Sequence, residues 1–356
     1  MVFSMVIGFF LSFFFLNFLR IKNGCMSFIY VSFVFRLDGG IYIMGIRRAV
    51  VALGGNALIR KNQVGTIYEQ FANTRDISVF LVKMIKNGWD MVVTHGNGPQ
   101  VGAILLQNEA GRDLVPAMPL GICVAESEGY IGYMIQQCLS NALRKEGVDK
   151  QVVTLITQVL VDENDPALSN PTKPIGPYYD ERRALQMRRE GYNMVKQAGG
   201  WRMVVPSPDP KTVVEGSIIR SMLDNGIIVI AAGGGGMPVV EKKGWGLDGL
   251  EAVVDKDLAA ERLAEAVEAE LLLILTDVER VYLNYNTSHQ RPLDNVTLSE
   301  IKKYYNQDQF PPGSMGPKIL AAIRFLEYGG KKVIISHIDH GWEALQGKTG
   351  TQISRE

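Results

Sequence analysis

Three lysines and one aspartate lie in sequence settings that suit the handling of negatively charged groups. Lys173 lies within NPTKPIGP, Lys256 and Asp257 within VVDKDLAAE, and Lys318 within PPGSMGPKI. Lys256 and Lys318 both stand at the start of a predicted helix, where a cation opposes the helix dipole, so each is a candidate to face an anion. Any single lysine is more often a solvated surface residue, and Asp257 could be an ordinary N-terminal helix carboxylate. In the functional interpretation the lysines neutralise charge during phosphoryl transfer, and Asp257 holds them or lies near a metal ion.

Three glycine-rich loops follow apolar, strand-like runs and could hold the anion. They lie within Ala49–Leu58 (AVVALGGNAL), Met91–Gln100 (MVVTHGNGPQ) and Ile227–Pro238 (IIVIAAGGGGMP). A strand that ends in glycines presents bare backbone N–H groups at its carboxyl end, where open α/β sheets bind anions. One such loop could be an ordinary tight turn, but three of the same kind predict one anionic ligand held from several strand ends. For His95, inside the second loop, we expect a hydrogen bond within the loop.

Strand-like and helix-like segments alternate along the chain, and they must position these loops. Helical periodicity predicts helices over Tyr68–Asn87, Val101–Ala110, Glu126–Glu146, Val213–Asn225, Asp257–Ala269 and Gly316–Tyr328. Apolar runs predict further strands at Val152–Val161, Met203–Val205, Leu271–Thr276, Lys332–Ser336 and Gly350–Ile353. This alternation predicts an α/β fold, a mostly parallel central sheet with helices on both faces. Residues 162–202 break the rhythm with a proline-rich polar run, which is typical of a lid subdomain.

The first 43 residues differ from the rest of the chain. Met1–Leu19 carries no charge and as a helix would reach roughly 28 Å, enough to cross a bilayer core, so a membrane anchor is one interpretation. Ten of the fourteen phenylalanines precede Met44, a bias expected when untranslated sequence is read as protein. We favour Met44 as the start, which predicts a cytoplasmic protein without a membrane partner and one domain over residues 44–356.

Composition excludes several classes of function, and we assign no chemistry to two further motifs. The 37 basic and 37 acidic residues balance, so there is no footprint of nucleic-acid binding. Three cysteines without paired spacing indicate neither a disulfide framework nor a zinc site. Gly341–Thr349 (GWEALQGKT) has one residue too many between its glycines for a phosphate-binding P-loop. His337 and His340 are interpreted as loop histidines, and no metal site is predicted.

Eight motifs in order along the chain resemble the carbamate kinases of the amino-acid kinase superfamily. They are ALGGNAL, HGNGPQVG, NPTKPIGPYY, VVPSPDPK, GGGGMPV, VDKDLAAE, LTDVERVYLNY and GSMGPK, and the resemblance runs from Arg47 to the end. It implies a three-layer sandwich with a small protruding lid, and it implies transfer of a phosphoryl group between ATP and carbamate. The products would be ADP and carbamoyl phosphate, with ATP formed when arginine is fermented. Mg²⁺ and a homodimer are also expected.

The same resemblance implies roles for individual residues. Lys256, Lys318, Asp257 and, from the lid, Lys173 would form the catalytic group. Substrate would be held by Gly54, Gly55, Asn56, Gly96, Asn97, Gly234 and Gly235. The nucleotide would be bordered by Thr276, Asp277, Val278, Tyr282 and Met315. Two alternatives stay open: another enzyme of the superfamily with a different carboxylate or phosphate acceptor, and a membrane-tethered, non-catalytic nucleotide sensor.

Overall fold

The computed structural model describes residues 20–22, 25–27, 33–37, 40–44, 47–197 and 199–356. The chain divides into two units, Met1–Arg47 and Arg48–Glu356. The first contains two antiparallel pairs of strands, β1 (Arg20–Lys22) with β2 (Cys25–Ser27) and β3 (Phe33–Leu37) with β4 (Gly40–Met44). The proposed membrane anchor, Met1–Leu19, lies outside the described residues, and the start at Met44 stays a prediction. None of the helices in the described ranges is long and apolar enough to cross a membrane.

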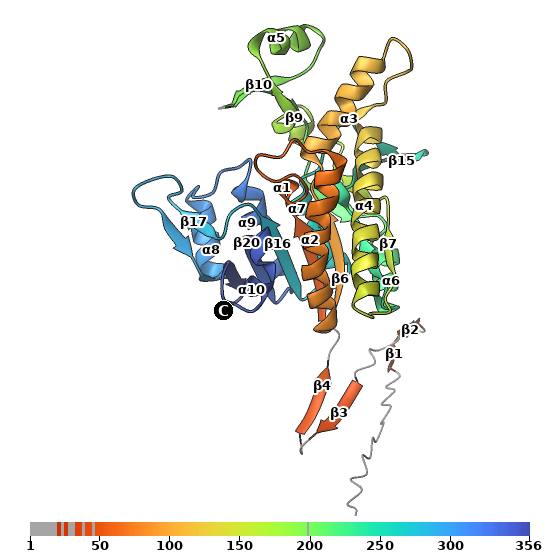
Figure 1. Ribbon diagram of the computed structural model, residues 1–356, viewed down its shortest axis with the longest axis vertical. Coiled ribbons are helices and arrows are strands. Elements are labelled where there is room, and N and C mark those ends of the chain that lie inside the picture. Colours follow the sequence, from red (N-terminus) through yellow and green to blue (C-terminus); the bar gives the residue numbers. More distant parts are fainter. Residues whose placement is uncertain (1–19, 23–24, 28–32, 38–39, 45–46, 198) are drawn as a thin grey trace, which may run out of the picture. The chain divides into compact units, whose positions relative to one another are not determined.

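An eight-stranded sheet forms the centre of the second unit (Figure 1). Its strands run in the order β19-β21-β20-β16-β5-β6-β13-β7. Parallel pairing joins β16 with β5 and β20, β13 with β6 and β7, and β19 with β21, whereas β20 and β21 are antiparallel. Their bounds are β5 (Arg47–Leu53), β6 (Trp89–His95), β7 (Val152–Thr154), β13 (Ile228–Ile230), β16 (Leu271–Thr276), β19 (Asn295–Thr297), β20 (Lys332–His337) and β21 (Thr351–Ser354).

Helices cover both faces of this sheet because its central strands are apolar on both sides. In β5, Val50 and Ala52 pack into one hydrophobic cluster, whereas Val51 and Leu53 pack into another. Since alternate residues of a strand point to opposite faces, the two clusters lie on opposite sides of the sheet. The first cluster includes residues of α6 (Gly216–Asp224), α7 (Lys256–Ala266), α8 (Leu298–Asn306) and α9 (Met315–Tyr328). The second includes residues of α1 (Gly55–Leu58), α2 (Ile67–Lys86), α4 (Leu120–Lys145) and α10 (Gly341–Leu345). The predicted three-layer α/β sandwich is confirmed.

The predicted helices are present, with ends that local chemistry sets. Thr66 and Glu69 form a capping box that begins α2 one residue before the predicted start. The helix α3 (Gly98–Gly111) begins earlier than predicted, at the residue before Pro99, and Asn97 is its N-cap. Asp255 caps α7 by accepting a hydrogen bond from the N–H of Asp257, which places Lys256 at the first helical position.

The prediction of one buried strand over Val152–Val161 is wrong. The run is divided between β7, at the edge of the central sheet, and β8 (Gln158–Val161), in a separate four-stranded sheet. Residues Leu155–Thr157 turn the chain from one sheet to the other without a glycine or proline, so the sequence shows no break. β7 is only partly buried because it lies at an edge, and in β8 buried residues alternate with partly buried ones.

Two smaller sheets and a hairpin complete the unit. The four-stranded sheet has the order β12-β8-β14-β15, with β12 (Pro210–Val213), β14 (Met237–Lys242) and β15 (Gly246–Gly249). A hairpin pairs β17 (Val281–Leu283) with β18 (Arg291–Leu293). The short 3-10 helices are η1 (Pro166–Leu168), η2 (Gly233–Gly235) and η3 (Ile338–His340).

The predicted lid segment, 162–202, carries most of a three-stranded antiparallel sheet. Its strands are β9 (Lys173–Tyr179), β10 (Met194–Gln197) and β11 (Gly200–Val205), with α5 (Glu181–Arg189) between the first two. In Figure 1, β9, β10 and α5 stand clear of the central sheet, beside the outer end of α3. Contact with α3 is close at one point: a Cβ atom on Gly102 would lie 1.9 Å from Cα of Gly176 in β9. Two glycines therefore allow the lid segment to rest on the body of the protein.

Candidate active site

Lys256, Asp257 and Lys318 form one hydrogen-bonded cluster. The Nζ atom of Lys256 donates to Oδ1 of Asp257 at 2.6 Å, and Nζ of Lys318 donates to Oδ2 at 2.8 Å. The Asp257 side chain is 4% exposed, and the two lysine side chains are 12% and 13% exposed. The start of α7 supplies the first two residues and the first turn of α9 supplies the third, as the position of both lysines at helix starts predicts.

Electrostatics in this cluster favour a bound anion. Burial alone would raise the pKa of Asp257, but the charges of Lys256 and Lys318 outweigh it, and that pKa lies well below its ordinary value. Burial also lowers the pKa of Lys256, with the neighbouring charge of Lys318 acting in the same direction. For Lys318 burial disfavours the ammonium, yet attraction by Asp257 prevails and the pKa is raised. Two cations share one carboxylate, so the cluster has one positive charge left for a ligand.

Lys173 reaches this region from the lid segment. Its Nζ atom donates to Oδ2 of Asp255 at 2.9 Å, and both side chains are about one-fifth exposed. The other oxygen of Asp255 accepts the N–H of Asp257 at 2.9 Å. Burial would raise the pKa of Asp255, but the charge of Lys173 outweighs it and lowers the pKa. Asp255, which sequence reasoning missed, therefore links the lid segment to the helix that carries Lys256.

The first two glycine loops touch each other beside Lys256. A Cβ atom on Gly96 would lie 3.0 Å from the backbone nitrogen of Gly55 and 3.2 Å from Cδ of Lys256. Gly54 donates its N–H to the carbonyl of Leu275 at 2.8 Å, and Gly96 donates its N–H to Leu53 at 3.0 Å. These two glycines therefore serve close packing against the strands, and both Gly54 and Gly55 line the neighbouring cavity.

The third glycine loop packs on the second loop and on the approach to α7. A Cβ atom on Gly234 would lie 2.1 Å from Nδ2 of Asn97, and one on Gly235 would lie 2.4 Å from the carbonyl oxygen of Val254. Both glycines have positive φ, 66° and 101°, which side chains larger than hydrogen rarely adopt. The three loops predicted to act together are thus brought together.

A cavity of about 400 Å³ opens next to the cluster. Its predicted lining residues are Gly54, Gly55, Lys256, Thr276, Asp277, Val278, Tyr282, Met315 and Lys318. Sequence reasoning missed the lining residues Arg280, Tyr285, Phe310, Pro311, Gly313 and Ser314. The rings of Tyr282 and Tyr285 lie 6.1 Å apart at its wall. Two of the missed residues belong to the motif LTDVERVYLNY, so the motif itself was the signal that could have found them.

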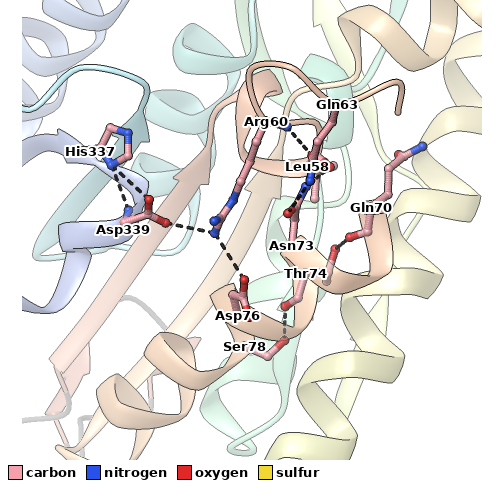
Figure 2. Close-up of polar contacts among 10 residues, drawn as sticks. All are labelled: Leu58, Arg60, Gln63, Gln70, Asn73, Thr74, Asp76, Ser78, His337 and Asp339. Carbon is pink, nitrogen blue, oxygen red and sulfur yellow. Dashed lines mark hydrogen bonds and ion pairs between the residues drawn. The ribbon is translucent and has the colours of Figure 1, made fainter. Parts of the chain in front are cut away.

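A polar network fixes the end of α1, whose first residue is Gly55 (Figure 2). Asn73 of α2 is 3% exposed, and its Nδ2 atom donates to the carbonyl of Leu58 at 2.8 Å and to Oε1 of Gln63 at 2.7 Å. Arg60 donates to Asp339 at 3.0 Å, which ties the same segment to the end of β20. For Asn56 the structure describes the backbone but not the side chain.

The histidines take part in local hydrogen bonds. Nδ1 of His95 lies 3.1 Å from the carbonyl oxygen of Gly96, so Nδ1 carries the proton and donates within the loop. Burial lowers the pKa of His95 to about 4, which keeps the ring neutral. His337 accepts a hydrogen bond from the N–H of Asp339 at 3.2 Å. Within the described ranges, no group of three or more His, Cys, Asp or Glu residues could hold a metal ion.

Comparison with known proteins extends over most of the chain. The Amino acid kinase family matches residues 47–337. The carbamate kinase of Pyrococcus horikoshii is 54% identical over 311 residues, which are 86% of this chain and 99% of that protein. The carbamate kinase of Trichomonas vaginalis is 47% identical over 310 residues, with the same coverage of 86% and 99%.

Solved structures agree with this similarity. The carbamate kinase from Giardia lamblia bound to AMP-PNP has a TM-score of 0.81 and 42% identity, covering 87% of this chain and 99% of that one. The same enzyme bound to citric acid has a TM-score of 0.82 and 41% identity, again covering 87% and 99%. The chain is therefore an ATP-dependent phosphotransferase, and it belongs to the carbamate kinases within the amino acid kinase family.

Proposed function

We propose that this protein catalyses reversible phosphoryl transfer between ATP and carbamate, giving ADP and carbamoyl phosphate, and that it works in the ATP-forming direction during arginine fermentation. The observation that carries this proposal is that Lys256, Asp257 and Lys318 form one buried cluster beside the first two glycine loops, and that both lysines and Gly55 line one cavity. The names of the similar enzymes support carbamate as the acceptor.

The proposed reaction needs positioning and charge neutralisation more than acid–base chemistry. Carbamate attacks through a carboxylate oxygen that is already ionised, so no general base has to remove a proton. Lys256 and Lys318 neutralise the charge that spreads over the transferred phosphoryl oxygens. Asp257 accepts a hydrogen bond from each lysine, which fixes the separation of the two ammonium groups before the reactants bind.

The glycine loops form the carbamate and phosphoryl side of the proposed site. Gly55 lines the cavity with its backbone, and Gly96 packs against it closely enough to exclude any side chain. Asn97 of the second loop contacts Gly234 of the third, and Gly235 packs against the carbonyl of Val254. We assign to these residues, together with Asn56, the holding of carbamate and of the phosphoryl group that it accepts.

The nucleotide occupies the opposite part of the cavity in this proposal. Thr276 ends β16 and Asp277 and Val278 follow it. Tyr282 and Met315 complete that wall. A magnesium ion would be held mainly by the nucleotide phosphates and would need few protein ligands. Asp277 is the carboxylate that lines the cavity and would stand nearest to it. When bound, the ion withdraws electrons from the phosphate oxygens.

Lys173 belongs to a closing element in this proposal. Its ion pair with Asp255 places it next to the cluster while it remains on the lid segment. Closing of the lid segment over bound reactants would exclude water from an acyl phosphate that hydrolyses easily.

The first experiment measures ATP formed from carbamoyl phosphate and ADP in a coupled assay. The enzyme should be active with carbamate and inactive with N-acetylglutamate, glutamate or uridylate. That pattern supports carbamate as the acceptor over the acceptors of other enzymes in the superfamily. The opposite pattern would overturn it. Light scattering of the same preparation measures the oligomeric state, for which a homodimer stays the prediction.

The second experiment replaces the lysines one at a time. We expect Lys256→Ala and Lys318→Ala each to lower kcat on the order of a hundredfold or more, while the Kd for ADP changes far less. Lys331→Ala, an exposed lysine after α9, is the control and should keep normal turnover. Near-normal turnover of either cluster variant would contradict the role assigned to that lysine.

A further inference from the structure

Glu128 is a buried carboxyl group in the middle of α4, directly behind the third glycine loop. It is 1% exposed. Its Oε2 atom accepts a hydrogen bond from the N–H of Thr157 at 3.1 Å, and the N–H of Gly233 also donates to this carboxyl group. Thr157 precedes β8 and Gly233 begins η2, so one side chain connects three parts of the fold.

The partners of Glu128 determine the shape of the third loop. The hydroxyl of Thr157 accepts the N–H of Ala232 at 3.0 Å, and Ala232 has the left-handed φ of 51°. A Cβ atom on Gly233 would lie 2.4 Å from Nε2 of His95 and 3.1 Å from Cγ of Glu128. Glu128, Thr157 and His95 therefore enclose the residue at which the loop departs from β13.

The neighbouring residue of α4 holds the second loop. Nδ2 of Asn97 donates to Oγ of Ser127 at 2.8 Å, and Oγ of Ser127 donates to the carbonyl of Val124 at 2.6 Å. Ser127 and Glu128 are both buried. Two consecutive residues of α4 thus support the two loops that we assign to the carbamate side of the site.

The surroundings of Glu128 disfavour a negative charge. Its Oε1 atom has no hydrogen-bond partner within the described ranges, so an ionised carboxylate would leave one buried oxygen without a donor. Burial raises the pKa of Glu128 well above its ordinary value, against the two backbone N–H groups, which favour the charged form.

Among the residues that the structure describes, no cation opposes the charge of an ionised Glu128. Glu215, at the N-terminus of α6, faces it, and the charge of Glu215 raises the pKa of Glu128 further. His95, at the end of β6, lies near Glu128 on the other side of Gly233, and its ring is neutral. Glu126, on α4 itself, is exposed to solvent.

We propose that Glu128 is a positioning residue of the phosphoryl-transfer site, held as a neutral carboxylic acid so that two glycine loops keep their shape and no negative charge lies behind bound anions. The proposal rests on the proposed function, since carbamoyl phosphate and the nucleotide phosphates are the anions concerned. Ionisation of Glu128 at alkaline pH places a like charge next to the loops and weakens the binding of these reactants.

The test compares pH profiles of the wild-type enzyme and Glu128→Gln. Glutamine keeps the acceptor oxygen for Thr157 and Gly233 but cannot ionise. In the wild type we expect the KM for carbamoyl phosphate to rise about tenfold as Glu128 loses its proton at alkaline pH. In E128Q we expect kcat within about threefold of the wild type near neutral pH and a KM that stays flat. In E128A we expect a lower kcat at every pH, because the loop loses its acceptor.

Infrared spectroscopy supplies a second measurement that does not depend on turnover. The carbonyl band of a protonated carboxylic acid should be present in the wild type at pH 7, weaker in E128Q, and titrated with the same midpoint as the KM. Glu261→Gln is the matched control: a buried carboxyl group in α7, remote in sequence from the loops, whose replacement should leave the KM profile unchanged.

An alkaline rise in KM that persists in E128Q, or a wild-type spectrum without a band assignable to Glu128 at pH 7, would overturn the inference. If E128Q does not fold, titration of the infrared band in Glu261→Gln, which lacks the other buried carboxyl group with a raised pKa, still decides it. If the wild type forms no ATP from carbamoyl phosphate and ADP at any pH, the proposed substrate fails, and the infrared band still reports whether Glu128 is neutral.

Discussion

Lys318 and Asp257 lie 61 residues apart in the sequence, yet Nζ of Lys318 is 2.8 Å from Oδ2 of Asp257. The contact joins the first turns of α7 and α9, two helices on the same face of the central sheet. The other oxygen of Asp257 accepts a hydrogen bond from Lys256, so each oxygen of this carboxylate is bonded to one lysine. We assign to Asp257 the role of holding the two cations.

Replacement of this carboxylate should reduce both stability and turnover. Asp257→Asn leaves two largely buried ammonium groups without a counter-ion, so we expect a loss of about 3 kcal/mol in the free energy of unfolding at pH 7. Since folding lowers the pKa of Asp257, the difference from the wild type should shrink as the pH falls below 3.8. Urea denaturation measures this. Asp339→Asn, which alters an exposed pair with Arg60 (Figure 2), should cost less than about 1 kcal/mol. Equal losses in the two variants would contradict the assignment.

Glu261 should make the protein less stable as the pH rises. Burial raises its pKa from 4.5 to about 7, with Arg262 and Arg324 opposing the shift. The folded state then binds a proton more tightly than the unfolded state does, so the stabilisation is complete below pH 4.5 and is lost as the pH rises through 7. Glu261→Gln avoids this loss and should exceed the wild type by roughly 2–3 kcal/mol at pH 8, as measured in urea. Glu265→Gln, an exposed change in the same helix, should show no such difference, and a matching gain there would argue against burial as the cause.

Gly102 should tolerate no side chain. The Cβ atom of Gly102→Ala would lie 1.9 Å from Cα of Gly176, so α3 and β9 would have to separate. We expect faster proteolysis within residues 162–202 and a lower melting temperature. Gly111→Ala, in the same helix, meets only an ordinary contact at 3.9 Å from Val115 and should behave like the wild type. Unchanged proteolysis of the Gly102 variant would show that this contact does not hold the lid segment.

Asn73 should affect turnover although it lies outside the cavity. Asn73→Ala removes the donor to the carbonyl of Leu58 and leaves a buried acceptor unpaired, which costs about 1–3 kcal/mol in the free energy of unfolding. Because that carbonyl ends α1, which begins at Gly55, we also expect a lower kcat. Asn87→Ala at the end of α2 alters an exposed cap and should keep the kcat of the wild type. Equal kinetics in the two variants would contradict this role.

Sequence patterns predict much of this fold because the relevant signals are local. The apolar runs AVVAL and LLLILT end where β5 and β16 end, and the helical periodicity of α9 begins within one residue of its observed start. The positions of Lys256 and Lys318 at helix starts follow from the same local patterns. The short distance between the two lysines in space cannot be predicted from these patterns, since it depends on how α7 and α9 pack.

The features that were missed depend on contacts between distant segments. The division of β7 from β8 has no turn residue to mark it, because the hydrogen-bonding partners on either side determine which sheet each half joins. In the sequence Asp255 has the features of an ordinary N-cap. Only the folded structure shows its ion pair with Lys173 of the lid segment. Glu128 lies on an apolar helix face, where its type alone gives no indication that it contacts two loops.

Asp255 divides its two oxygens between the start of α7 and Lys173 of the lid segment. A phosphate that attracts Lys173 would compete with one of these oxygens for the lysine, and the other oxygen would stay bonded to the N–H of Asp257. Loss of the ion pair with Lys173 would therefore leave the N-cap of α7 in place, and with it the start of the helix that carries Lys256 and Asp257.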